Sequence, residues 1–359
     1  MKFAWLQNST FRRAGMMLAA ALFATTLVAA EPGDRGIFVV TSTNNPSGNS
    51  VEVFKLNTSG TPSLSLVNTL STGGKGGAST NAGILQFQDD FGAAANFGSN
   101  TVSQLVRYQD HVGLGRTISL ASDCVKPGSV ALAHSHLFVV GANCAESHDW
   151  PSGNLDSPVV SLADPSAAQI AVGKTWAAVT LSSGSVLQLP LTHEDGALNG
   201  TQTSITLPSN ANSVPLGAAF WRNNLGFTPA HSPDSFAIID EERNIFPIAG
   251  PSPSFPTNAP CWVAKGPGSV WYTGNSPGKA ISIFFTDGLG GVFYKSIPLP
   301  GSPTDITVSP DHKWLAVIYS VSGEAFVAVF SIDSYGDLTL AATSGAIGVA
   351  SFSGVAISE

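Results

Sequence analysis

The chain has 359 residues, a formal net charge of −8 and 11% charged residues, with 37 glycines and 23 prolines. So few basic side chains offer no positive stripe to a phosphate backbone, and we expect no nucleic-acid partner. A chain this rich in Gly and Pro favours strands joined by turns over surface helices.

Residues 1–30 differ from the rest. Basic residues precede an apolar run from Ala14 to Ala30, which ends in small residues directly before Glu31. This order is typical of a cleaved secretory signal peptide, and the run lies at the short limit for a membrane span, which takes about 20 apolar residues. We therefore expect a signal peptide over 1–30, a secreted or periplasmic mature chain, and no stable membrane span after cleavage. The paired Arg12-Arg13 leaves a twin-arginine route open.

Beyond Glu31 the apolar residues come in short runs rich in Val, Ile, Phe, Ala and Thr, separated by Gly, Pro, Asn, Asp and Ser. Such runs predict strands and turns, and no comparable segment sustains a 3.6-residue period. A unit of a strand, a polar turn and a second strand recurs seven times. Its copies begin at Ile37 (IFVVTSTN), Gly92 (GAAANFGSN), Leu137 (LFVVGAN), Trp176 (WAAVTLSSG), Leu225 (LGFTPAHSPDS), Val270 (VWYTGNSPG) and Trp314 (WLAVIYSVSG).

Seven copies over 31–359 give about 47 residues each, the length of one propeller blade. Each copy needs one more strand ahead of it, which segments such as 128–132 and 304–308 supply. The first copy lacks such a strand, and Phe352–Ser358 is left over at the end. We expect this C-terminal strand to join the N-terminal blade and close the ring. The prediction is one all-β domain, a seven-bladed β-propeller of four-stranded antiparallel blades.

The third copy is the weakest. The stretch from Cys144 to Pro165 is predicted as a loop with one convincing strand, Ser157 to Leu162. Six blades with an insertion is therefore the alternative.

The three cysteines suggest one disulfide and one free thiol, because exported proteins meet an oxidising compartment. Cys124 precedes the predicted strand 129–133, and Cys144 follows its partner strand 137–142. Folding this hairpin about Ser135 brings both cysteines to the same end. We predict a Cys124–Cys144 disulfide.

The last blade carries the clearest repeat. Residues 303–317 read PTDITVSPDHKWLAV, and FSID at 330–333 is followed by GDL at 336–338. These phrases resemble the repeat of lactonase-type seven-bladed propellers, a family that includes 6-phosphogluconolactonases and muconate cycloisomerases. The resemblance is spread over nearly all of 31–359 and concerns architecture, which does not fix function.

For the enzymatic members, the resemblance implies histidines at the start of inner strands, with Arg and Glu nearby. This chain has instead Pro127-Gly128-Ser129, Pro215-Leu216-Gly217 and Pro260-Cys261-Trp262. No lactonase site is therefore carried over residue by residue. The first functional hypothesis is a lactonase-like hydrolase or isomerase acting on a small sugar-acid lactone. The alternative is a non-catalytic extracytoplasmic propeller that binds a small molecule or an envelope or extracellular partner. We expect a monomer.

Loops that enter the inner strands, and loops between second and third strands, meet on one face of a propeller around its channel. Candidates for a ligand-binding funnel on this face are Asn96, Lys126, Asn143, Cys261, Trp262, Asn275 and Asp305. His231 is the candidate catalytic acid or base, because imidazole titrates near neutral pH. The competing interpretation is that each asparagine shapes its own turn and that His231 is a solvated loop residue.

Two histidine groups contain metal-ligand residue types, namely His134 with His136 and His148 with Asp149. Neither has a third clustered ligand. We predict no cofactor, while a divalent metal stays open. No Gly-x-Ser-x-Gly elbow occurs on a strand-to-helix turn, and there is no Walker loop or dinucleotide fingerprint.

Overall fold

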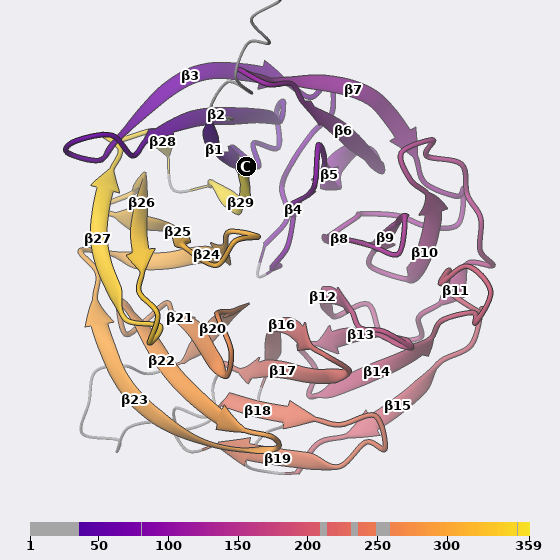
Figure 1. Ribbon diagram of the computed structural model, residues 1–359. Coiled ribbons are helices and arrows are strands. Elements are labelled where there is room, and N and C mark those ends of the chain that lie inside the picture. Colours follow the sequence, from indigo (N-terminus) through magenta and orange to yellow (C-terminus); the bar gives the residue numbers. More distant parts are fainter. Residues whose placement is uncertain (1–35, 80, 209–213, 231–235, 249–258, 350) are drawn as a thin grey trace, which may run out of the picture. The chain divides into compact units, whose positions relative to one another are not determined.

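The computed structural model describes residues 36–79, 81–208, 214–230, 236–248, 259–349 and 351–359. In these ranges the strands form seven antiparallel sheets arranged in a ring (Figure 1), and the only helical element is the 3-10 turn η1 (Phe97–Ser99). The predicted all-β, seven-bladed propeller is thereby confirmed, and the six-bladed alternative is wrong. The expected signal peptide lies outside the described residues.

Each blade has four strands, which follow one another from the ring axis outward. Blade 1 contains β29 (Ser353–Ser358), β1 (Ile37–Ser42), β2 (Ser50–Asn57) and β3 (Ser63–Ser71), and blade 2 contains β4 (Leu85–Gln88), β5 (Phe91–Asn96), β6 (Thr101–Arg107) and β7 (Val112–Ser119). Blade 3 contains β8 (Ser129–Ala133), β9 (His136–Val140), β10 (Cys144–Asp149) and β11 (Val160–Ser161). Blade 4 contains β12 (Ala167–Val172), β13 (Trp176–Leu181), β14 (Ser185–Pro190) and β15 (Thr203–Thr206).

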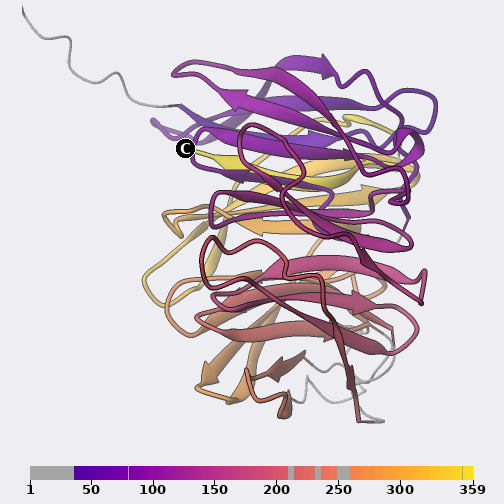
Figure 2. The ribbon, with the colours of Figure 1, turned by 90° about the vertical axis from the view of Figure 1, so that its right-hand side faces the viewer.

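Blade 5 contains β16 (Pro215–Trp221), β17 (Asn224–Pro229), β18 (Phe236–Ile239) and β19 (Ile245–Ile248). Blade 6 contains β20 (Pro260–Lys265), β21 (Val270–Asn275), β22 (Ala280–Asp287) and β23 (Gly290–Pro298). Blade 7 contains β24 (Ser302–Val308), β25 (Trp314–Val321), β26 (Glu324–Ile332) and β27 (Leu338–Thr343). A short strand, β28 (Gly348–Val349), also pairs with β26. Figure 2 shows the blades from the side, with their strands running across the view.

The core is divided into layers, one between each pair of neighbouring blades. Between blades 3 and 4, for example, Phe138 and Val140 pack against Ile170 and Val179. Strands buried on both faces need apolar residues at successive positions, which explains the near-continuous apolar runs of the second strands, such as LFVV in β9.

The ring closes through blade 1, as predicted. β29 is its innermost strand and pairs antiparallel with β1, so that Val39 lies opposite Ile357. Arg107 of blade 2 fastens this junction, because its guanidinium donates to Ser358 Oγ at 3.0 Å and to the carbonyl oxygen of Gly36 at 2.6 Å. Both ends of the ring are thus held by one buried cation.

The inner strands begin with a β-bulge in several blades. The register shifts between Ala167 and Gln169 in β12, and between Pro303 and Asp305 in β24. Bulges redirect side chains and bend the strand. Gln169 and Asp305 each follow a bulge and reach sideways to the backbone of another inner strand.

Blade 3 differs from the sequence prediction, because Cys144–Asp149 is not a loop but the strand β10. The polar segment CAESHD is buried apart from its last residue. Glu146 and His148 pair at 2.8 Å inside the sheet, and Glu146 also accepts from the N–H of Ala121. A polar strand is stable here because its buried groups have partners.

The predicted disulfide is present. Cys124 and Cys144 are bonded, with their Cα atoms 5.2 Å apart, and Cys261 is a free thiol. Such a bond is typical of proteins outside the reducing cytosol. No helix in the described ranges is long and apolar enough to cross a membrane.

Candidate functional site

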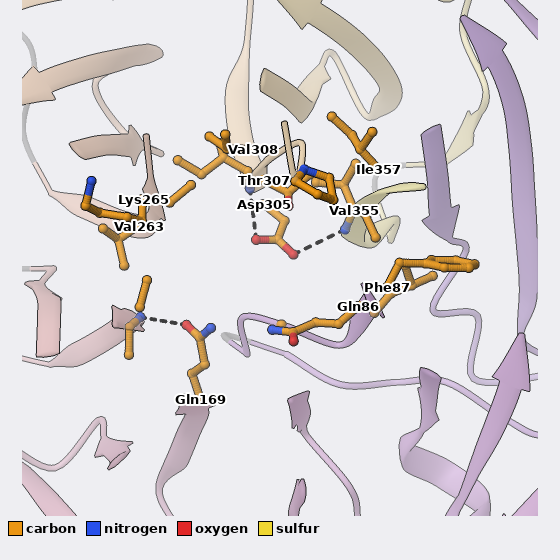
Figure 3. A pocket seen from close by; sticks show the side chains of 18 residues that line it. Gln86, Phe87, Gln169, Val263, Lys265, Asp305, Thr307, Val308, Val355 and Ile357 are labelled. Carbon is orange, nitrogen blue, oxygen red and sulfur yellow. Dashed lines mark hydrogen bonds between the residues drawn. The ribbon is translucent and has the colours of Figure 1, made fainter. Parts of the chain in front are cut away.

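The central channel contains a cavity of about 240 Å³, which we call the channel cavity. It is lined by the inner strands of six blades and extends to the face where these strands end, since Lys265 and Pro310 belong to its lining. Figure 3 shows the carboxyl of Asp305 and the amide ends of Gln86 and Gln169 pointing toward one another across it.

Asp305 is the carboxyl group of the channel cavity. Its side chain accepts hydrogen bonds from the N–H of Ile306 at 2.9 Å and of Val355 at 3.3 Å, and Gly83 contributes a further backbone hydrogen bond. Burial raises the pKa of Asp305 to about 7, against the opposing effect of these bonds. A carboxyl with such a pKa exists in both protonation states near neutral pH.

Two glutamines face Asp305. Gln169 Oε1 accepts from the N–H of Ala218 at 2.7 Å, and Gln86 Oε1 accepts from the N–H of Leu132 at 3.3 Å. Each inner strand is a sheet edge whose backbone groups need partners, and these amides supply them. Neither glutamine was identified from the sequence. The available signal was a polar residue on an otherwise apolar inner strand.

Lys265 lies at the mouth of the channel cavity, and Figure 3 shows its ammonium group turned away from Asp305. Its Nζ donates to the carbonyl oxygens of Gly266, Gly268 and Val270 at 2.7 to 3.1 Å. It also lies 5.2 Å and 5.3 Å from the ring centroids of Trp221 and Trp271. Burial lowers the pKa of Lys265 to about 8. This side chain therefore holds its own turn.

A second cavity, of about 470 Å³, lies at the face where the inner strands begin, and we call it the funnel. Leu216, Ala230, Trp262 and Phe352 give it an apolar lining, with hydroxyl groups such as that of Ser276 among them. Trp262 is fixed because its indole N–H donates to the carbonyl oxygen of Pro303 at 2.9 Å.

Cys261 also lines the funnel. Its Sγ donates to the carbonyl oxygen of Ala259 at 3.3 Å, and burial raises the pKa of the thiol to about 11. The thiolate is the nucleophilic form of cysteine, so this thiol is unreactive near neutral pH. Ser276 lies in the sequence Gly274–Gly278, a Gly-x-Ser-x-Gly match, but this turn joins two strands and is not a nucleophile elbow.

The predicted site residues fall in different places. Cys261 and Trp262 line the funnel, and Asp305 lines the channel cavity. Lys126 lines a third cavity, of about 370 Å³, beside Asn81 and Ser166. The candidate catalytic residue His231 lies outside the described residues.

The three predicted asparagines are engaged in holding turns. Asn96 is buried and donates to Thr101 and Ser103. Asn143 bonds the backbone of the loop around Cys124, and Asn275 donates to Ser282 at 2.6 Å. None of the three lines the channel cavity, the funnel or the third cavity.

The histidines considered as metal ligands have protein partners. His134 bonds the carbonyl oxygen of Gly173, and His136 lies between the Asp156 carboxylate and the carbonyl oxygen of Asp195. His148 pairs with Glu146. In the part of the chain that the structure describes, no three His, Cys, Asp or Glu side chains are grouped as a metal site would require.

No protein-family model matches the sequence, and no curated protein matches it either. Solved structures do share the fold. A functionally unknown protein from Desulfotomaculum acetoxidans is 14% identical with a TM-score of 0.67, and the match covers 90% of this chain and 99% of the other. The periplasmic gluconolactonase of Pseudomonas aeruginosa is 14% identical with a TM-score of 0.63, over 90% and 99%.

Virginiamycin B lyase from Staphylococcus aureus is 13% identical with a TM-score of 0.54, and here the match covers 78% of this chain and 94% of the lyase. What the chain shares with these proteins is therefore the propeller fold. Because the two named neighbours carry out different reactions, the likeness establishes the fold and not the activity.

Proposed function

We propose that this chain is an exported, non-catalytic propeller that binds a small, largely apolar molecule in the funnel. The observation that carries the proposal is the funnel lining, where apolar side chains surround a few hydroxyl groups. Ligand sites in proteins have this composition, an apolar wall with few polar groups that orient the ligand. The signal-peptide pattern of residues 1–30 and the disulfide support export.

The funnel offers little acid–base chemistry among its described residues. Its one titratable side chain there is the Cys261 thiol, whose raised pKa keeps it protonated. General acid–base catalysis needs a group whose pKa lies near the working pH. Binding is therefore better supported than turnover.

Lactone hydrolysis is the second candidate. It is favoured by Asp305, whose pKa of about 7 suits a general base, and by the likeness of the fold to a gluconolactonase. The Asp305 carboxyl lines the channel cavity and not the funnel, so a lactone would have to reach the channel for this group to act.

Dihydrocoumarin, a neutral aromatic lactone, tests both candidates with the mature protein. We expect titration calorimetry to show one binding site and absorbance to show no ring opening above the buffer rate. Ser276→Trp fills the funnel and should weaken binding at least tenfold, which corresponds to about 1.4 kcal/mol. Ser183→Trp, in the corresponding exposed turn of blade 4, is the control and should leave the affinity unchanged.

Binding that survives Ser276→Trp would contradict the funnel as the site. Ring opening by the wild type that is lost in Asp305→Asn or His231→Ala, but kept in Ser183→Trp, would establish the second candidate instead.

A further inference from the structure

Two side-chain amides, those of Gln86 and Gln169, present hydrogen-bond donors in the lining of the channel cavity. Gln169 is 6% exposed, and its orientation is fixed because only an oxygen can accept from the N–H of Ala218. Its Nε2 group is therefore turned to the cavity. The same argument, through the N–H of Leu132, orients Gln86. The structure shows no protein hydrogen bond from either Nε2 among the described residues, and both nitrogens lie next to Gly83 in the cavity lining.

These groups define what the cavity accepts. Each amide nitrogen carries two N–H donors, so an occupant must present acceptors to Gln86 and Gln169. A cation would meet these donors instead of ligand oxygens. Above the pKa of Asp305, which is about 7, an anion would meet an ionised carboxylate within the same small space. A hydroxyl group satisfies both sides, because it accepts from an amide and donates to a carboxylate.

We propose that the channel cavity is a second binding site, distinct from the funnel, for a neutral molecule with several hydroxyl groups, such as a monosaccharide or a cyclic polyol. Gln86 and Gln169 donate to its hydroxyl oxygens, and Asp305 accepts from its hydroxyl groups. The cavity and the funnel share none of their described lining residues.

The size of the cavity limits the occupant. A volume of about 240 Å³ is smaller than the roughly 300–1,000 Å³ of sites for drug-sized ligands. One sugar ring is therefore the upper limit. Access is from the face where the inner strands end, where Thr307, Val308 and Pro310 of blade 7 line the cavity.

D-Glucose and D-glucuronate at pH 8 are matched probes, because both are pyranose rings and only the second is an anion. We expect saturation-transfer NMR and calorimetry to detect glucose binding to the mature wild type, with glucuronate at least tenfold weaker. Gln86→Glu and Gln169→Glu keep an oxygen for the N–H groups of Leu132 and Ala218 but remove the donors. Each should weaken glucose binding at least tenfold.

Gln188→Glu is the matched control, because it adds the same charge on β14, outside the channel cavity. It should bind glucose as the wild type does, and so should Ser276→Trp, whose change is confined to the funnel. A variant counts only if its circular dichroism and unfolding midpoint show a folded propeller; Gln86→Leu and Gln169→Met replace either variant that fails.

Three results would overturn the proposal. The wild type could show no glucose binding at 100 mM, a concentration that half-fills a site whose binding free energy is only about −1.4 kcal/mol. Glucuronate could bind more tightly than glucose. Glucose could bind equally well to wild type and to both glutamine variants. Loss of glucose binding in Ser276→Trp alone would place the sugar in the funnel. The proposal of a funnel site would then hold, and the proposal of a channel-cavity site would fail.

Discussion

Asp305 links two blades of the ring and also makes the stability of the ring depend on pH. It ties β24 to β29 through the N–H of Val355, yet it is a carboxyl group buried without a cation beside it. Its pKa of about 7 in the folded protein lies above the value of about 3.9 expected in an unfolded chain. The folded state therefore binds a proton that the unfolded state has released between these pH values.

The stability contributed by Asp305 should consequently fall as the pH rises from about 4 to about 7, by at most about 4 kcal/mol. Asp305→Asn carries no such proton. We expect the free energy of unfolding of the variant, measured in urea, to increase relative to that of the wild type as the pH rises from 5 to 8. Parallel pH profiles for the two proteins would contradict the assignment of this dependence to Asp305.

The strand β10 shows the same chemistry at the scale of an element. Its Glu146 and His148 are both almost completely buried, with side chains 0% and 1% exposed, and they pair inside blade 3. Glu146→Ala should destabilise the protein by about 3–5 kcal/mol, because it leaves the His148 ring and the N–H of Ala121 without their carboxylate. Glu324→Ala, at the exposed start of β26, is the control and should stay within about 0.5 kcal/mol. Chemical denaturation of both variants gives the comparison.

This element also marks the limit of prediction from sequence. Apolar runs and turn residues predicted the second strands and the closing strand correctly, because those strands are buried by generic packing that the residue types alone reveal. CAESHD was predicted as a loop, because its burial depends on the specific partners Ala121 and Gly153, which local patterns do not show. The asparagines at strand ends could be named from sequence, but not whether their amides face a ligand or their own turns. Gln86 and Gln169 were missed, since only the ring brings them together.

At the scale of the whole molecule, the ring depends on β29. This strand covers the inner edge of β1 and supplies Val355 and Ile357 to the core layer between blades 7 and 1. Removing residues 352–359 should abolish cooperative thermal unfolding and cause aggregation, because the edge and the apolar layer are exposed together. A synthetic peptide of residues 351–359 should restore the cooperative transition, whereas a scrambled peptide should not. A truncated protein that still unfolds cooperatively at the wild-type temperature would show that closure is dispensable.

The composite first blade has a consequence for biosynthesis. β1 to β3 are synthesised before the other six blades and β29 after them, so six blades can assemble while the first still lacks its fourth strand. During this interval the inner edge of β1 is unpaired, and the β29 of another nascent copy can pair with it as well as its own β29 can. Synthesis of many copies close together would therefore favour strand-exchanged dimers. The guanidinium of Arg107 favours the correct intramolecular pairing, because it bonds both Gly36, next to β1, and Ser358 of β29.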